Sequence, residues 1–302
     1  MIVVKLSGGI GNQMFQYAFG RNLSKMKGKK VKYDISSLEN DNLRKFSLGC
    51  FDVNISFAND TEVNTLTENR LLSVMSKIKI KPERLRVFLL FSSYKIIPIK
   101  LRKCVTQTKL SFDPMFFKVS NAVYLDGYWQ SEKYFHGVEN ELRKDFKFKS
   151  KLIGKDKKIA NLIKQKNSVS VHIRRGDYIL NESTNNLHGV CSLDYYKSAL
   201  GVVEKSVKDP YYFIFSDDIS WAKDKLNFLK NCFFVEGKNR KDFEDMYLMS
   251  LCKNHIIANS SFSWWGAWLS KNKTKLIIAP NKWFNTVYWD SSDVVPENWV
   301  KI

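Results

Sequence analysis

The chain has 302 residues, of which 44% are hydrophobic and 26% charged, a composition typical of a globular enzyme of about two domains. Its longest purely apolar runs are as short as Val87–Phe91, which excludes a transmembrane helix by sequence alone. The formal net charge of +19 predicts a surface that attracts the phosphates of nucleic acid, anionic lipid or a phosphorylated ligand, unless the cations serve only solubility.

The positive charge is concentrated in residues 76–109, which contain ten basic residues and one acidic residue, Glu83. We expect this segment to contact an anionic membrane, with plain solvation and nucleic-acid binding as the alternatives. The five cysteines are scattered and have no CxxC spacing, which predicts free thiols in a reducing compartment. The first residues do not resemble a signal peptide. We therefore expect a cytoplasmic protein, peripheral at the inner membrane face if the basic segment binds there.

The first half of the chain opens with a β–loop–α–β unit. A short apolar strand at Ile2–Leu6 leads into SGGIGNQ and a helical pattern over Met14–Lys25, and the next strand ends at Asp34. Residues 40–125 are less regular. The charged stretch 144–158 is expected to connect this half to the next.

The second half alternates strands with helices. Strands are predicted at 169–173, 211–215, 232–235, 255–258 and 275–280, and helices at 156–165, 193–207 and 243–251. Such alternation predicts a parallel sheet covered on both faces, with ligands beyond the carboxyl ends of its strands. The polar clusters HIRRGD, SDD and NSSFS follow three of these strands, so we expect them to converge.

The loop GGIGNQ after the first strand allows three interpretations. Gly9 and Gly11 resemble the start of a dinucleotide fingerprint, but Met14 occupies the position of its third glycine. The glycines also suit a tight turn at positive φ. We favour a bare backbone that a ligand approaches, with Asn12 and Gln13 pointing into a cleft from a helix N-terminus.

HIRRGD carries the strongest chemical signal. Strand alternation puts His172 and Arg174 on one face and Arg175 on the other. We expect Arg174 to face the ligand and Arg175 to anchor the loop through Asp177. A guanidinium is a planar fork that suits bidentate binding of phosphate or carboxylate. A structural Arg–Asp ion pair at the strand end is the alternative.

Asp217 and Asp218 directly follow another predicted strand. Paired carboxylates can hold a metal, act as acid and base, or accept hydrogen bonds from guanine and ribose. One of them is also well placed to cap the helix that begins near Ser220. The chain contains no D-x-D triplet, so a metal motif common in sugar-nucleotide enzymes is missing.

NSSFSWWGAWLS reads as a strand end, a polar loop and an aromatic helix. The backbone N–H groups at this helix N-terminus are predicted to form an anion site, which involves Ser260, Ser261, Phe262 and Ser263. Trp264, Trp265 and Trp268 are expected to pack in the core rather than to form a platform for sugars.

In combination, GGIGNQMFQYAFGRNLS, HIRRGDY, FSDD and NSSFSWWGAW resemble the bacterial α-1,2-fucosyltransferases of glycosyltransferase family 11. The resemblance runs from the first strand to about Trp283 and is weak over 40–110, and HGVCSLDYYKSAL is similar to members that build O-antigen polysaccharide. It implies a GT-B-like α/β fold of two Rossmann-like domains that face each other across a cleft. Residues 1–150 would form the acceptor-side domain and 151–302 the domain that binds GDP-fucose.

The same resemblance implies the reaction and its participants. L-fucose would pass from GDP-β-L-fucose to the 2-hydroxyl of a terminal β-galactoside, on an oligosaccharide or a lipid-linked glycan. The transfer would invert the anomeric carbon and use no cofactor and no metal. A basic nucleic-acid or membrane-surface protein and an NAD-dependent oxidoreductase are the competing interpretations.

The resemblance also implies roles for the residues at matching positions. Arg174 would bind the β-phosphate with support from Arg175, and His172 with one or both of Asp217 and Asp218 would hold the guanosine. The other implied residues cradle the diphosphate, face the acceptor or support the loops, and these are Ser260, Ser261, Phe262, Ser263, Asn12, Gly9, Gly11, Gln13 and Asp177. No residue identifies itself as the base for the acceptor hydroxyl, and the candidates by residue type alone are Asp34, Asp126, Glu182 and His188.

Overall fold

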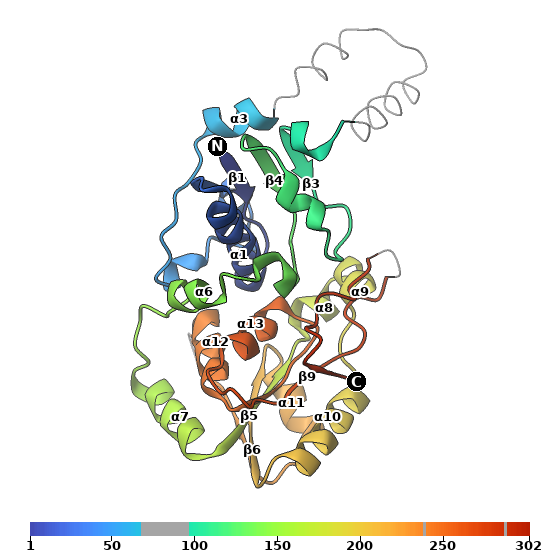
Figure 1. The fold of residues 1–302 in the computed structure, drawn as a ribbon. Coiled ribbons are helices and arrows are strands. Elements are labelled where there is room, and N and C mark those ends of the chain that lie inside the picture. The colour runs from blue at the N-terminus through green and yellow to red at the C-terminus, as the bar shows by residue number, and fades with distance from the viewer. Residues whose placement is uncertain (68–96, 238–239, 287–288) are drawn as a thin grey trace.

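The computed structural model describes residues 1–67, 97–237, 240–286 and 289–302 (Figure 1). Most of the predicted membrane-contact segment, residues 76–96, lies outside these ranges. Within the described part, no helix is long and apolar enough to cross a membrane.

The first half contains a four-stranded parallel sheet in the order β2-β1-β4-β3. The strands are β1 (Ile2–Lys5), β2 (Val31–Asp34), β3 (Cys104–Thr106) and β4 (Val123–Asp126). The α-helices of this half are α1 (Ile10–Lys27), α2 (Ser36–Glu39), α3 (Asp60–Thr67) and α6 (Glu139–Asp145), and the 3₁₀ turns are η1 (Leu48–Cys50), η2 (Ile99–Leu101), η3 (Pro114–Lys118) and η4 (Glu132–Phe135). The helix α1 begins four residues earlier than predicted, so Gly11 already belongs to it.

The second half contains a six-stranded parallel sheet in the order β10-β9-β8-β5-β6-β7. Its strands are β5 (Asn167–Ile173), β6 (Pro210–Ser216), β7 (Cys232–Phe234), β8 (Asn254–Ile256), β9 (Ile277–Ala279) and β10 (Val300–Lys301). Its helices are α7 (Gly154–Gln165), α8 (Gly176–Leu180), α9 (Glu182–His188), α10 (Leu193–Ser206), α11 (Ile219–Lys225), α12 (Asp242–Leu251) and α13 (Ser261–Leu269). The central strand β5 is buried from Ser168 to Ile173, as expected for a strand covered on both faces.

The two parallel sheets confirm the predicted fold class, a GT-B-like α/β protein with two Rossmann-like units (Figure 1). They lie on either side of the connection between α6 and α7, which is where the charged stretch 144–158 was expected to join the halves. The division at residue 150 stays a prediction, because residues near the C-terminus return to the first half. There, Asp293 accepts a hydrogen bond from the backbone N–H of Phe112 (2.9 Å).

One apolar core runs through both halves. Phe15 of α1 lies against Trp264 and Trp265 of α13, with ring centroids 4.6 and 4.9 Å apart. Phe135 of η4 stacks on Trp265 (5.4 Å). Trp264 and Trp265 are fully buried and Trp268 nearly so, which confirms the prediction that these tryptophans pack in the core. The helix that carries a predicted anion site is therefore held by residues of the opposite half.

Candidate active site

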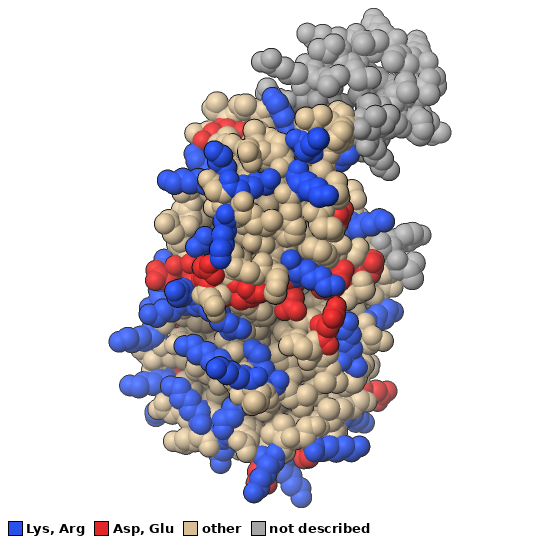
Figure 2. Space-filling view, in the orientation of Figure 1, with Lys and Arg blue, Asp and Glu red and all other residues tan. Residues whose placement is uncertain are grey.

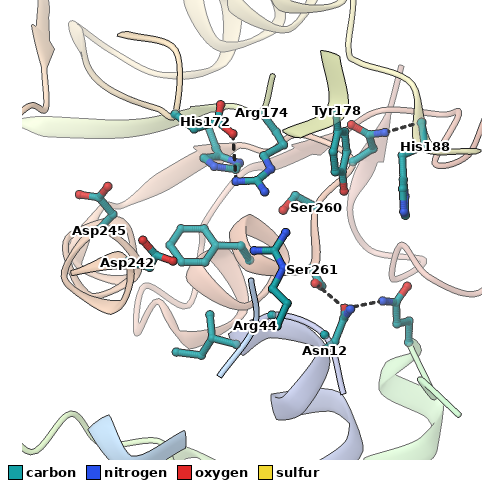
Figure 3. Close-up of a pocket in the computed structure, with 18 of the residues that line it drawn as sticks. Asn12, Arg44, His172, Arg174, Tyr178, His188, Asp242, Asp245, Ser260 and Ser261 are labelled. Atoms are coloured by element: carbon teal, nitrogen blue, oxygen red, sulfur yellow. Dashed lines mark hydrogen bonds and ion pairs between the residues drawn. The ribbon is translucent and has the colours of Figure 1, made fainter. Parts of the chain in front are cut away.

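A cavity of about 580 Å³ lies between the two halves, beyond the carboxyl ends of β1, β5 and β6 (Figure 3). The glycine loop, Arg44 and Gln130 line it from the first half. The ends of HIRRGD, SDD and NSSFS line it from the second half, so the three polar clusters converge as predicted.

The N-termini of α1 and α13 meet at this cavity. Neither helix has a side-chain cap: the N-cap residues are Gly9 and Ser260, and no side-chain hydrogen bond closes either turn. The first N–H groups of a helix have no partner within it and carry partial positive charge. Two such ends around one cavity make it suitable for an anion.

The two glycines of the loop differ in what surrounds them. A Cβ on Gly9 would touch only Arg44, at 4.0 Å, so its backbone is open to a ligand as predicted. A Cβ on Gly11 would lie 2.5–2.7 Å from backbone atoms of Ser261 and Phe262. At Gly11 the missing side chain therefore admits α13 rather than a ligand. The tight turn belongs to Gly8, whose φ is +72°.

Arg174 projects into the cavity from the end of β5 (Figure 3). Its Nη1 lies 2.9 Å from Oδ2 of Asp217, and its guanidinium carbon lies 5.4 Å from the ring centroid of Tyr178. The ion pair fixes one edge of the guanidinium fork. An anchored cation of this kind can stabilise negative charge without first reorganising.

Arg175 points away from the cavity, as strand alternation predicted. Its Nε lies 3.2 Å from Oδ2 of Asp218, and its guanidinium carbon lies 4.1 Å from the centroid of the Trp221 ring. Asp218 caps α11 by accepting from the N–H of Trp221 (3.1 Å). Neither residue lines the cavity, so the expected contact of Asp218 with guanosine has no geometric basis. The predicted anchor through Asp177 concerns a side chain outside the described part of the structure.

His172 lies beside Arg174 on the cavity wall and is almost completely buried. Burial, together with the charge of Arg174, lowers the pKa of His172 to about 3, so the ring is neutral at pH 7. Its Nδ1 has no hydrogen-bond partner among the described residues. A buried nitrogen without a partner is costly unless a ligand supplies one.

Asn12 joins the two halves at the floor of the cavity (Figure 3). Its Oδ1 accepts from Oγ of Ser261 (2.7 Å) and from Nε2 of Gln130 (2.8 Å). Because two donors occupy the oxygen, the amide NH₂ is the group that Asn12 offers to a ligand.

The prediction that Gln13 points into the cleft is wrong. Its side chain is buried: Nε2 donates to the carbonyls of Gly8 (2.8 Å) and Lys45 (2.9 Å), and Oε1 accepts from the N–H of Ser47 (2.9 Å). Gln13 therefore supports the loop. Ser263 is also buried, with its Oγ donating to the carbonyl of Ser260 (3.2 Å), so only its backbone can contribute to the anion site.

Sequence reasoning missed several residues that line the cavity. Arg44 reaches in from the loop before η1, and Asp242 and Asp245 lie in the first turn of α12 at the opposite end from Tyr178 (Figure 3). Burial raises the pKa of Asp245 to about 6 against the opposing charge of Arg240, with which it forms an ion pair. The sequence did offer one signal for α12, a group of three acidic residues at the start of a predicted helix. This pattern does not identify a binding site, because acidic residues also stabilise a helix N-terminus through the helix dipole.

Of the four candidates for a base, His188 is the one that lines the cavity. Its ring stacks on Tyr178 (4.8 Å). Asp34 instead accepts from the hydroxyl of Tyr124 (2.7 Å), and Asp126 pairs with Lys5 (3.1 Å). Glu182 does not belong to the lining.

Among the described residues, no group of three or more His, Cys, Asp or Glu side chains is arranged to hold a metal ion. The polar side chains that line the cavity are two arginines, three aspartates, four amides, two imidazoles and several hydroxyls, and the N-termini of α1 and α13 border it. Such a set suits an extended ligand with an anionic middle. A nucleoside diphosphate joined to a small polar group has this shape.

Two parallel α/β units with a cavity between them, lined by an arginine and two helix N-termini, form a GT-B-like fold with a site suited to an anionic ligand. The family model for glycosyl transferase family 11 matches residues 1–302. The chain is 33% identical to an α-1,2-colitosyltransferase of Escherichia coli, a match that covers 100% of this chain and 99% of that protein. It is 30% identical to the O-antigen biosynthesis glycosyltransferase WbnK of E. coli, covering 98% of this chain and 99% of that protein.

The chain therefore belongs to glycosyltransferase family 11. The predicted family and enzyme class, a glycosyltransferase of the α-1,2-fucosyltransferase type, are confirmed. Among solved structures, the fucosyltransferase NodZ from Bradyrhizobium is similar at a TM-score of 0.47 and 14% identity, with 88% of this chain and 91% of that chain covered.

Proposed function

We propose that this enzyme transfers L-fucose from GDP-β-L-fucose to the 2-hydroxyl of a terminal β-galactoside, in the assembly of O-antigen or a similar surface glycan. The acceptor is an oligosaccharide or a lipid-linked glycan. Membership of family 11 supports the reaction class, and the similarity to an O-antigen glycosyltransferase supports the pathway class.

The observation that carries the proposal is the position of Arg174 beside the N-terminus of α13, in a cavity shared by both halves. When the bond between fucose C1 and the phosphate oxygen breaks, the electron pair stays on the β-phosphate of GDP. The guanidinium and the amides of Ser261 and Phe262 are donors that are already oriented toward that charge. Removing one such donor from other enzymes costs about 10²–10³ in rate.

The guanine of the donor is assigned to the end of the cavity formed by Asp242 and Asp245, next to His172. Guanine presents adjacent N–H donors along one edge, and ionised carboxylates only accept hydrogen bonds. The neutral ring of His172 also has a buried nitrogen for which a ligand would be the partner. This assignment replaces Asp218, which does not line the cavity.

The fucose and the acceptor are assigned to the other end, near Asn12, Tyr178 and His188. The galactose 2-hydroxyl attacks C1 from the face opposite GDP, which inverts the anomeric carbon. The NH₂ of Asn12 is available to orient a sugar oxygen, since its carbonyl is already occupied. His188 is the imidazole on this side that can accept the proton of the acceptor hydroxyl.

A second donor is favoured by one specific observation, the 33% identity with an α-1,2-colitosyltransferase. Colitose is fucose without its 3-hydroxyl. A site that hydrogen-bonds this hydroxyl would reject GDP-colitose strongly, whereas a site that leaves it in water would accept both donors.

Transfer assays with purified enzyme test these assignments. GDP-fucose and GDP-colitose would be offered with a panel of β-galactose-terminated oligosaccharides, and the linkage would be read by NMR. We expect an α-linked 6-deoxy sugar on O2 of galactose. A β-linked product, or transfer to another position, contradicts the proposal.

The same assay tests independence from metal. Because the chain has no D-x-D motif and an arginine is available for the leaving phosphate, we expect activity in EDTA within about tenfold of that with manganese, or about 1.4 kcal/mol of barrier. A larger loss that manganese restores rejects this part of the proposal. Thermal-shift assays test the competing functions. Stabilisation by NAD but not by GDP would favour an oxidoreductase, and stabilisation by single-stranded DNA but not by GDP would favour a nucleic-acid-binding protein.

A further inference from the structure

A second hollow, of about 1150 Å³, lies outside the active site where the end of the first half meets the second. Residues 143–148, the end of α7, the end of α12 and residues 269–272 form its walls. Six cations line it and Asp52 is the one acidic residue of the described lining; the cations, which we call the basic groove, are Arg143, Lys144, Lys147, Lys164, Lys253 and Lys271. Figure 2 shows Lys and Arg side chains gathered on this side of the molecule, around α7 and below α6.

The cations of the basic groove are not balanced by acidic partners. Elsewhere on the surface, lysines pair with carboxylates, as Lys25 does with Glu141 (2.6 Å) and Lys223 with Glu236 (2.9 Å). Within the described part of the chain, no groove cation forms such an ion pair. Arg143 lies over the Trp268 ring (4.1 Å), and Lys253 donates to Oδ1 of Asn167 (3.1 Å). A concave surface lined by six cations and one carboxylate attracts anionic groups.

The groove is separate from the active-site cavity, although α12 contributes residues to both. Asp242, in the first turn of α12, lines the active-site cavity, whereas Tyr247 and Leu251, further along the helix, line the groove. Phe148 also lines the groove and bridges to Phe51. Phe148 and Tyr247 stack on each other at 4.4 Å with an interplanar angle of 6°, so each ring already has a partner. Nucleic acid would need aromatic faces that are open for base stacking.

The connection that follows groove residue Phe148 in the chain and leads to the start of α7 adds an apolar group among further cations. Ile153, between α6 and α7, is 78% exposed. It is flanked in sequence by exposed lysines, namely Lys149, Lys151, Lys155, Lys157 and Lys158. The backbone of Ile153 caps α7, but its side chain is exposed, and an exposed isoleucine between lysines suits the boundary between lipid headgroups and acyl chains.

We propose that the basic groove and the Ile153 segment dock this enzyme on an anionic phospholipid bilayer. Headgroup phosphates occupy the groove and Ile153 enters the interface. The docking site consists of described residues and is independent of residues 76–96. It also serves the proposed function, since an acceptor on a lipid would be presented at the same surface.

Vesicle sedimentation with the full-length chain tests the proposal. The groove variant carries Lys144→Glu, Lys147→Glu and Lys164→Glu. The control variant carries Lys197→Glu, Lys205→Glu and Lys208→Glu, three exposed lysines on and just after α10. Each set changes the net charge by −6, from +19 to +13, so both variants have the same overall charge. A third variant, Ile153→Ser, removes the apolar group and no charge.

At low salt, the wild-type protein is expected to bind vesicles that contain phosphatidylglycerol and not to bind vesicles of pure phosphatidylcholine. Each lysine at an anionic leaflet changes partition by about fivefold. We therefore expect the groove variant to lose at least about 100-fold, the control less than about tenfold, and Ile153→Ser several-fold.

Equal losses in the two triple variants, absence of binding by wild type, or tighter binding to single-stranded DNA than to vesicles would overturn the proposal. Transfer to a soluble galactoside is measured for each variant in parallel. Because the groove lies outside the active site, we expect this activity to be the same in the variants as in wild type. If wild type binds anionic vesicles and the variants lose binding by the expected factors, but wild type transfers no sugar to any galactoside, the proposed function fails and the docking site stands.

Discussion

Arg174 and Arg175 are adjacent in sequence and each pairs with an aspartate, yet they have different surroundings. Arg174 pairs with Asp217 and lines the cavity. Arg175 pairs with Asp218 and lies over the Trp221 ring, outside the cavity lining. Both arginines therefore form the Arg–Asp pair that was the alternative interpretation of this motif, and of the two only Arg174 also lines the cavity.

The substitution Arg174→Lys distinguishes two possible roles of Arg174, hydrogen bonding in a fixed direction and positive charge alone. Lysine keeps the positive charge but is shorter and lacks the planar fork. We expect kcat to fall by at least about 10²-fold, with GDP affinity less affected, because the lost donor acts on the leaving phosphate. Steady-state kinetics and a GDP titration measure both effects.

Arg175→Lys is the matched control. It should cost about 1 kcal/mol of stability through the lost stacking on Trp221, and change kcat by only a few-fold. If Arg174→Lys retains activity within a few-fold of wild type, Arg174 does not stabilise the leaving group.

At the scale of single residues, the sequence could predict the cavity residues that lie at the ends of strands. It could not predict the cavity residues that lie in an irregular loop or at the start of a helix. His172, Arg174 and Asp217 lie at the ends of β5 and β6, where parallel strands bring side chains together. Arg44 comes from an irregular loop, and Asp242 from a helix start. No local pattern marks these two as cavity residues, because their position depends on how the two halves pack.

At the scale of elements, the active site depends on the contact between the first turns of α1 and α13. Gly11 is the point of closest approach, and the hydrogen bond between Asn12 and Ser261 lies one residue away. The aromatic residues of both helices hold this contact from behind. The amides that would bind the diphosphate are therefore positioned by a helix–helix packing that only glycine allows.

The substitution Gly11→Ala tests this arrangement. Its Cβ would lie 2.5 Å from the carbonyl carbon of Ser261, so the two helix ends must separate. We expect a loss of about 1–3 kcal/mol in stability and a fall in kcat of at least about tenfold, because the donors move relative to the leaving phosphate.

Gly201→Ala in α10 provides the control, since its Cβ would meet no atom within 4 Å. Alanine there should stabilise the protein by about 0.5–1 kcal/mol and leave kcat unchanged. Melting temperatures and kcat for both variants are the measurements. Wild-type activity in Gly11→Ala would mean that the spacing of the two helices does not matter for transfer.

The elements themselves were largely predictable, because apolar runs alternated with helical patterns in the second half. The strands β3 and β4 were missed because they are three and four residues long and lie in an irregular region. The helices α8 and α9, with sequences GDYIL and ESTNNLH, carry no apolar stripe of helical period. The contact between α1 and α13 was also beyond prediction, since it joins residues about 250 positions apart.

At the scale of the whole molecule, the two halves share an apolar core instead of meeting only through polar groups at a cleft. Phe15 and Phe135 from the first half contact Trp264 and Trp265 from the second. Large apolar interfaces of this kind oppose independent domain motion. We therefore expect the cleft to keep its shape and the halves to unfold together.

Truncation of the shared core tests this expectation. Phe15→Ala removes a fully buried ring of the first half that contacts two tryptophans of the second, and such changes cost about 3–5 kcal/mol. Phe213→Ala removes a buried ring of β6 that belongs to a separate apolar cluster of the second half. If the halves unfold as one unit, each variant lowers the midpoint of one common transition, followed by both tryptophan fluorescence and far-UV circular dichroism. Two separated transitions, with Phe15→Ala shifting one and Phe213→Ala the other, would show instead that the halves are independent domains and that the cleft between them can open.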